Sequence, residues 1–283
     1  MRIKCGYEIS YQCFQPTPFM ALLSVHPSRR GDLESPDVLQ PSAGVATTSF
    51  VDAFGNRTTR FTAPAGITTL RSDFVIRDSG EPDAYAPDAR EVPVERLPNE
   101  ALFYLMASRY CEVDQLSDLA WSLFGGVAPG WSRVQAIVDY THQRIAFGYQ
   151  HADKFRTAAR AHDDQRGVCR DYAHLAVPLC RAMNIPARYC TGYLGDIGVP
   201  VNDAPMDFSA WFEVFLEGRW YTFDARHNTP RIGRVLLARG RDATDVAITT
   251  AFGTALLNGF KVITDEVTST GADQDAPGFM QPR

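Results

Sequence analysis

The stretch from Phe208 to Asp224 constrains the fold of this chain most, because it alternates like two strands joined by a short turn. The dipeptide Glu217-Gly218 separates the two runs, and a two-residue turn there pairs Leu216 with Arg219. Side chains alternate between the two faces of a sheet. One face is therefore apolar and is predicted to face the core; it carries Phe208, Ala210, Phe212, Val214, Leu216, Tyr221, Phe223 and Ala225.

The opposite face of this hairpin is mixed. It carries Ser209, Trp211, Glu213, Phe215, Trp220, Thr222 and Asp224. Ser209 and Asp224 become diagonal neighbours on adjacent strands, within side-chain reach of each other. Trp211 and Trp220 are predicted either to line a substrate groove on this face or to pack in a core or between domains.

One cysteine, Cys169, stands directly before an apolar run that is compatible with a helix. Backbone N–H groups at the start of a helix are unpaired, and the helix dipole is positive there. A thiol in that position tends to ionise and to become a nucleophile. The pattern predicts a helix from Cys169 to Met183, ended by Asn184 and Pro186. The alternative role for Cys169 is that of a small buried apolar residue.

The rest of the chain divides by composition and periodicity. Residues 1–75 are predicted to be β-rich, with a hairpin turn at 52–57, and residues 78–98 form a connection rich in Pro and Asp. Helices are then expected from Asn99, which caps the first, to Tyr110, from Asp114 to Phe124 and from Trp131 to Ile145. The predicted divisions are an N-terminal β-rich domain (1–90), a second domain (91–268) and a loose tail (269–283).

Five short motifs follow one another in a specific order. They occupy 167–175 (Gly-Val-Cys-Arg-Asp-Tyr-Ala-His-Leu), 184–189, 192–193, 210–214 and 218–224. Together they resemble the bacterial transglutaminase-like superfamily over roughly residues 130–230. The resemblance implies an α+β fold, with a papain-like core of helices on an antiparallel sheet preceded by an N-terminal β-sandwich-like domain. It also implies that Cys169 is the nucleophile, which forms a thioester with a peptide or carboxamide substrate, and that Asp224 orients a histidine.

The family histidine stands directly before the Ala-Trp pair, and this chain has Ser209 at that position. Serine cannot take a thiol proton near neutral pH, whereas a general acid–base residue contributes about 10²–10⁴-fold to rate. His227 is the candidate substitute base if the chain bends after Ala225 and turns the imidazole back toward Asp224. A water-bridged arrangement of Ser209 and Asp224 is a further alternative. His174 is predicted to be a buried, hydrogen-bonded histidine.

Two functions are compatible with these residues. The first is a thiol-dependent amide or peptide hydrolase, or an acyl transferase, that acts through a Cys169 thioester. The second is a catalytically impaired pseudoenzyme or peptide-binding module, because Ser209 replaces the family histidine. Gln165 is close enough to Cys169 in sequence to be a candidate for the lining of the site.

Composition argues against several other classes. The six cysteines are dispersed without a CxxC pair, which favours free thiols in a reducing cytoplasm and predicts no metal or other cofactor. Lys and Arg are scattered and the net charge is -5, so a nucleic-acid partner is not supported. No run approaches the ~18 apolar residues of a membrane span, and the N-terminus has no apolar signal core. The sequence therefore predicts a cytoplasmic protein without a membrane partner, and it does not indicate an oligomeric state.

Overall fold

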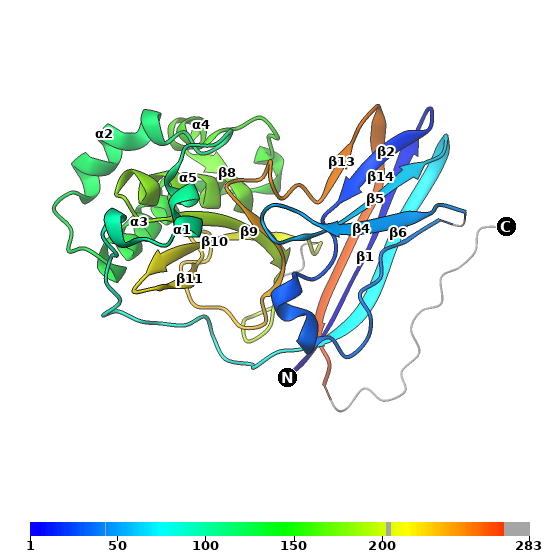
Figure 1. Ribbon diagram of the computed structural model, residues 1–283, viewed down its shortest axis with the longest axis horizontal. Coiled ribbons are helices and arrows are strands. Elements are labelled where there is room, and N and C mark those ends of the chain that lie inside the picture. The colour runs from blue at the N-terminus through cyan, green and yellow to red at the C-terminus, as the bar shows by residue number, and fades with distance from the viewer. Residues whose placement is uncertain (43, 202–204, 269–283) are drawn as a thin grey trace.

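The computed structural model describes residues 1–42, 44–201 and 205–268 of the chain. The predicted loose tail, 269–283, lies outside the described residues. Figure 1 shows a part made of long strands beside a part that holds most of the helices. None of the helices found in the described ranges has the length and apolar character that crossing a membrane requires.

The strand-rich part is a sandwich of two four-stranded sheets, with strand orders β14-β1-β6-β3 and β13-β2-β5-β4. Alternate side chains of both sheets point inward and form one core, as Ile3, Phe19, Phe61 and Phe74 do. The predicted turn at 52–57 is present, because β4 and β5 pair on either side of it. The strands are β1 (Arg2–Cys13), β2 (Thr17–Ala21), β3 (Gln40–Pro41), β4 (Thr47–Val51), β5 (Arg57–Ala63), β6 (Gly66–Arg77), β13 (Thr249–Ala251) and β14 (Ala255–Glu266).

The last two strands of the described chain return to the sandwich. β14 pairs with β1 along nearly its whole length, and β13 pairs with β2. The division predicted from the sequence places residues 249–266 in the second domain, whereas the strand pairing places them in both sheets of the sandwich. The strand β1 therefore lies in the interior of its sheet, because β6 pairs with one of its edges and β14 with the other.

The second part is built on a four-stranded antiparallel sheet of order β11-β10-β9-β12. The hairpin register agrees with the prediction, since Leu216 pairs with Arg219 across the turn. Glu217 and Gly218 both adopt positive φ there, as this class of two-residue turn requires. The strands are β9 (Ala187–Tyr193), β10 (Ser209–Leu216), β11 (Arg219–Phe223) and β12 (Val235–Gly240).

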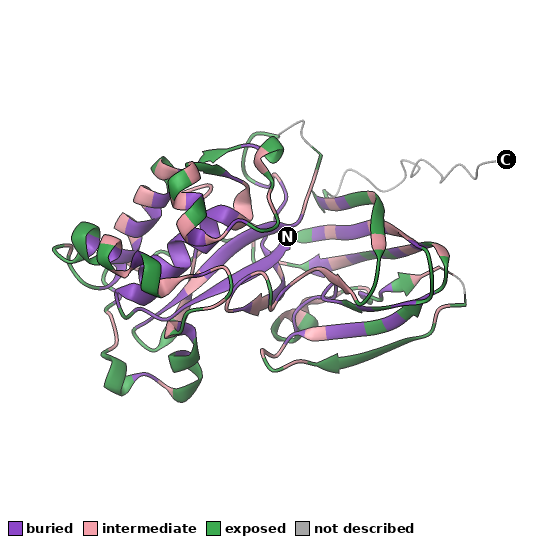
Figure 2. Ribbon diagram, turned by 90° about the horizontal axis from the view of Figure 1, so that it is seen from above, coloured by how far each residue is buried: buried purple, intermediate pink, exposed green. Residues whose placement is uncertain are grey.

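Helices cover the apolar face of this sheet. The central helix is α5 (Cys169–Ala182), and Figure 2 shows it buried against the sheet. Phe212, Val214 and Phe223 from the sheet join α5 in one core. The other helices are α1 (Asn99–Leu102), α2 (Val113–Phe124), α3 (Trp131–Arg144) and α4 (Ala158–Asp164), and a short parallel pair consists of β7 (Ala146–Phe147) and β8 (Arg166–Gly167). This layering is the α+β class that the sequence predicts.

The first predicted helix is shorter than expected. α1 ends at Leu102 and a 3₁₀ turn follows to Leu105, while Pro98 rather than Asn99 holds the N-cap position. The chain leaves the helical path at Met106, whose carbonyl accepts a hydrogen bond from the buried Arg181 guanidinium at 2.9 Å. Tertiary hydrogen bonds thus override helix propensity in residues 106–110.

Candidate active site

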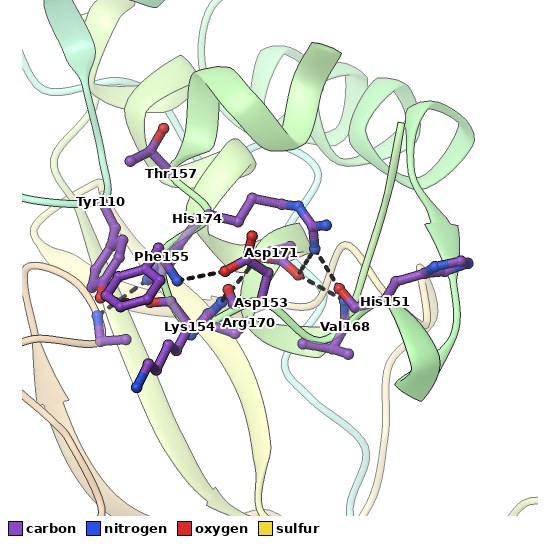
Figure 3. Close-up of polar contacts among 12 residues, drawn as sticks. Tyr110, His151, Asp153, Lys154, Phe155, Thr157, Val168, Arg170, Asp171 and His174 are labelled. Carbon is purple, nitrogen blue, oxygen red and sulfur yellow. Dashed lines mark hydrogen bonds and ion pairs between the residues drawn. The ribbon is translucent and has the colours of Figure 1, made fainter. Parts of the chain in front are cut away.

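The start of α5 is held in place by a buried carboxylate. Asp171 accepts a hydrogen bond from the backbone N–H of Val168 at 2.8 Å and lies 3.3 Å from the Arg156 guanidinium (Figure 3). A side chain at position 167 would collide with this carboxylate, since a Cβ added to Gly167 would lie 2.5 Å from it. The Gly-Val-Cys-Arg-Asp segment therefore places Cys169 at the first helical position with little freedom to move.

Cys169 is half-buried, whereas the other five cysteines are fully buried, and all six are free thiols. Burial raises the pKa of the Cys169 thiol to about 11, and the nearby Arg226 guanidinium opposes that rise only in part. A position at the helix start favours ionisation, but the loss of hydration of the thiolate outweighs that effect here. A thiol in this setting needs a proton acceptor before it can act as a nucleophile.

A cavity of about 550 Å³ opens beside Cys169 at the junction of the two parts of the molecule. Tyr189 on β9 and Ala210 on β10 form one wall. Ile248, which directly precedes β13, and Phe260, which lies on the sandwich strand β14, form another wall. The C-terminal strands therefore contribute to the space in front of the thiol as well as to the sandwich.

Asp224 and His227 are brought together directly after β11. The chain bends at residues 225–227, and the His227 Nδ1 atom lies 2.8 Å from Oδ2 of Asp224. The other oxygen, Oδ1, accepts hydrogen bonds from the backbone N–H groups of Arg226 at 3.0 Å and His227 at 3.1 Å. The bend needed to turn His227 back is therefore present, and the Asp224 side chain itself stabilises it.

Ser209 borders both the cavity at the thiol and the cavity at the imidazole. Together with Asp207, it lines both the Cys169 cavity and a smaller cavity of about 50 Å³ that is lined by His227 and Arg226. Among the residues that the structure describes, no hydrogen bond joins the Cys169 sulfur to an imidazole. The backbone N–H of Ala210 is the group that donates toward that sulfur.

Arg234 completes the surroundings of Asp224. Its Nη2 atom donates to Asp224 Oδ2 at 2.9 Å, and both side chains are buried. Burial by itself would raise the pKa of Asp224, but Arg234 and the hydrogen bonds from His227 outweigh it and hold that pKa well below its usual range. Asp224 is thus an ionised carboxylate whose hydrogen bonds come from His227, Arg226 and Arg234 rather than from the Ser209 hydroxyl.

Three other predicted site residues lie apart from the Cys169 cavity. Trp211 is buried on the far face of the sheet, where the Arg234 guanidinium lies 5.0 Å from its ring centroid. Trp220 packs against Tyr104, and the guanidinium carbon of Arg188 lies 3.9 Å from the centroid of the Trp220 ring. Gln165 is exposed and ends α4 in the left-handed conformation. Neither tryptophan lines the Cys169 cavity, although Trp211 borders a separate cavity of about 290 Å³ beside Arg234, so a role of the tryptophans in a substrate groove stays a prediction.

His174 lies one turn along α5 from Cys169 and is completely buried. Its Nε2 atom accepts a hydrogen bond from the backbone N–H of Ala243 at 3.1 Å. The imidazole stacks on the Tyr110 ring, as Figure 3 shows, with 5.0 Å between the centroids. This agrees with the prediction of a buried, hydrogen-bonded histidine.

Sequence reasoning missed four residues that the structure places in these surroundings: Asp207, Arg226, Arg234 and Phe260. Asp207 directly precedes the predicted strand and carried no motif. Arg226 lies between Asp224 and His227 in sequence, so its presence near the site could have been predicted from the sequence. Arg234 and Phe260 reach the site only through long-range packing, for which the local pattern holds no signal.

Comparisons with known proteins agree with this fold. A family model described as the transglutaminase-like superfamily matches residues 118–225. A solved structure described as a "Putative Cysteine Protease from Cytophaga hutchinsonii" is 29% identical and aligns with a TM-score of 0.81, covering 100% of this chain and 94% of that one. The similarity therefore includes the sandwich as well as the region of the family model.

Two further similarities are more limited. The periplasmic domain of TgpA from Pseudomonas aeruginosa is 19% identical with a TM-score of 0.39, over 80% of this chain and 73% of that one. A curated protein of Mycobacterium leprae, described as uncharacterized, is 36% identical over 89 residues. Those residues are 29% of this chain and 30% of that relative, so the chain matches less than a third of its length.

Proposed function

Because residues 118–225 form a domain of the transglutaminase-like superfamily, we propose that this protein is a thiol-dependent amide or peptide hydrolase that acts through a thioester at Cys169. The observation that carries the proposal is the 2.8 Å contact between His227 and Asp224, because His227 lines a small cavity that shares Ser209 and Asp207 with the larger cavity at Cys169. The full-length similarity to a protein described as a cysteine protease favours hydrolysis over transfer to an amine.

In the proposed reaction, the Nε2 atom of His227 takes the proton of the Cys169 thiol, because Nδ1 is engaged by Asp224. The sulfur attacks the carbonyl carbon of a peptide or carboxamide bond and forms a C–S bond. The imidazolium then returns its proton to the leaving amine as the C–N bond breaks. In the second half, His227 takes a proton from water, the resulting hydroxide attacks the thioester, and the thiolate leaves and regains that proton.

Ser209 has a spatial role in this proposal. It stands at the position of the family histidine and borders both cavities. A serine fills much less volume than an imidazole, so it leaves room between the thiol and His227 for a substrate and for proton transfer. Asp224 keeps the imidazole in the tautomer with the proton on Nδ1 and stabilises the imidazolium when it forms.

The alkylation rate of Cys169 tests the proposal. A thiol of pKa about 11 holds ~10⁻⁴ of its population as thiolate at pH 7, about 300-fold less than an ordinary thiol of pKa ~8.5. If His227 accepts the proton, iodoacetamide labels Cys169 at pH 7 at least as fast as glutathione, as followed by mass spectrometry of the Cys169 peptide.

The matched variant in this test is His227→Gln, and His151→Gln is the control, because His151 belongs to a different loop. We expect His227→Gln to slow labelling by about 10²-fold, in line with the loss of a general base, and His151→Gln to leave it unchanged. Labelling of the parent protein that is some 100-fold slower than that of glutathione, and that does not respond to His227→Gln, contradicts the proposal.

A pseudoenzyme or peptide-binding module is the second candidate, and two observations favour it. Ser209 replaces the family histidine, and burial holds the Cys169 thiol protonated. In that case Ser209→His creates amide hydrolysis that the parent protein lacks. If the parent protein already hydrolyses amide substrates as fast as the Ser209→His variant, the second candidate is wrong.

A further inference from the structure

A chain of buried and half-buried polar groups leads from the connecting segment of the molecule to the imidazole of His227. Asp83 lies in the segment that crosses from the sandwich to the helices, and both of its carboxylate oxygens lie 2.9 Å from Nε of Arg234. Nη2 of Arg234 contacts Asp224 at 2.9 Å, and Asp224 contacts His227 at 2.8 Å. Only the contact between Asp224 and His227 belongs to the reaction scheme above; the contacts of Arg234 do not.

The carboxylate of Asp224 has little freedom to rotate. Oδ2 is shared by the Arg234 guanidinium and the His227 imidazole, while Oδ1 binds two backbone N–H groups of the bend. Rotation of the carboxylate would break four hydrogen bonds in a buried place, where lost hydrogen bonds are not replaced by water. The direction of the imidazole is therefore fixed by the same carboxylate that Arg234 holds.

Arg234 is itself held from two sides. Its guanidinium lies over the Trp211 ring, 5.0 Å from the centroid, and its Nε is bound by Asp83. Asp83 is tied to the loop a second time, because its backbone and carboxylate form two 2.9 Å hydrogen bonds with the backbone of Arg231. The crossing segment and the loop that follows His227 thus form one connected unit.

We propose that Arg234, clamped by Asp83, is a positioning residue that orients Asp224 and sets the pH range in which His227 exchanges its proton. The proposal rests on the function proposed above for His227. Arg234 competes with the imidazolium for one carboxylate oxygen, so its positive charge makes the imidazolium less favourable. Without it, Asp224 holds the proton of the imidazolium to a higher pH.

Other charged groups also face His227 and must be kept in place during the test. Apart from Asp224 and Arg234, they are Arg226 in the bend, Arg231 in the following loop, Asp196 after β9 and Asp207 before β10. Arg231 also contacts Asp196, at 4.0 Å. A substitution at Arg234 changes none of these side chains, so a change in the pH profile reports on the removed guanidinium.

The experiment compares Arg234→Met and Arg234→Lys with Arg133→Met in the full chain. Arg133 is a matched control, because it also forms a buried pair with a carboxylate, Glu91 at 2.9 Å, and belongs to no part of the site. Two readouts are taken on folded protein. The first is the pH profile of Cys169 alkylation, and the second is the low-field NMR signal of the His227 Nδ1 proton, assigned with His227→Gln.

In Arg234→Met, the limb of the alkylation profile that disappears in His227→Gln moves to higher pH by about 2 pH units. That shift is the order expected for two unit charges ~5–6 Å apart at an effective dielectric constant of ~20. The Nδ1 proton signal shifts or broadens as the imidazole loses its fixed direction. Arg234→Lys restores part of the profile, because an ammonium keeps the charge but cannot bridge Asp83 and Asp224 as a fork. Arg133→Met changes stability without moving either readout.

An Arg234→Met protein that is folded and has the parent profile and the parent Nδ1 signal overturns the proposal. So does a control that shifts as much as Arg234→Met. If Cys169 of the parent protein is unreactive at every pH, the proposed function fails, and the NMR signal alone decides the positioning role. If Arg234→Met does not fold, Arg234→Lys takes its place: a profile and an Nδ1 signal identical to those of the parent protein then reject the proposal.

Discussion

The buried His174 predicts a loss of stability when the pH falls from 7 to 5. Burial lowers the pKa of its imidazole from 6.5 to about 3, and the Arg170 guanidinium acts in the same direction. Geometry gives the same sign, because Nε2 accepts the Ala243 N–H and cannot do so once it is protonated. Nδ1 carries the N–H of the neutral imidazole and is buried without a partner among the described residues, so protonation breaks the bond at Nε2 and gains no other.

The magnitude follows from proton linkage. The folded state keeps His174 neutral, while the unfolded chain binds a proton below pH 6.5, so stability is complete above 6.5 and is lost as the pH falls toward 3. At pH 5, which is about 1.5 pH units below the pKa of the unfolded histidine, protonation stabilises the unfolded chain by about 2 kcal/mol. His26, whose pKa burial lowers to about 4, adds a loss of the same sign.

Urea unfolding at pH 7 and pH 5 measures this loss, and His174→Gln isolates it. Glutamine offers an oxygen to the Ala243 N–H but does not titrate, so each protein is compared with itself at the two pH values. We expect the free energy of unfolding of the parent protein to fall by about 2 kcal/mol more than that of His174→Gln. Equal losses in the two proteins refute the reasoning, because they place the titration elsewhere.

Two further predictions concern β9 and the Asp224 bend. Gly192→Ala destabilises the protein by more than about 3 kcal/mol in urea unfolding, because its Cβ would lie 2.1 Å from the carbonyl oxygen of Val235, on the paired strand β12; Gly126→Ala, where nothing lies within 4 Å, changes stability far less. Asp224→Asn lowers the free energy of unfolding by about 3 kcal/mol, because it removes the charge that faces Arg234, and it also slows Cys169 alkylation at least tenfold. A stable Asp224→Asn protein with unchanged alkylation contradicts the assignment of Asp224.

The elements that the sequence predicted well are those whose geometry is local. The Glu217-Gly218 turn determines the register of its hairpin, so the pairing of Leu216 with Arg219 followed from a single dipeptide. The helix that starts at Cys169 was recognisable from its apolar run, and it ends at Ala182, two residues before Asn184, which adopts positive φ. In both cases the residues that determine the structure are adjacent in sequence.

The return of the C-terminal strands was not predictable in that way. β14 pairs with β1, more than 200 residues earlier, and most of its side chains are exposed or half-buried. A strand of this kind has little hydrophobic alternation, so its residues do not differ locally from an extended loop. Phe260 reaches the Cys169 cavity through this pairing, and Ile248 reaches it next to β13, which pairs with β2. These long-range pairings explain why the sequence placed no site residue beyond His227.

The Asp224 carboxylate contributes in two ways to the position of His227, the proposed base. A histidine on a strand, as at the family position, would be aimed by the backbone of the sheet. His227 is instead carried by a bend that exists because Asp224 accepts the N–H groups of Arg226 and His227. The residue that orients the imidazole is thus also the residue that builds the turn holding it. Loss of the Asp224 carboxylate would remove the hydrogen bonds that it accepts within the bend and its contact with the imidazole together. The buried Arg234 guanidinium, itself bound by Asp83, holds that carboxylate ionised.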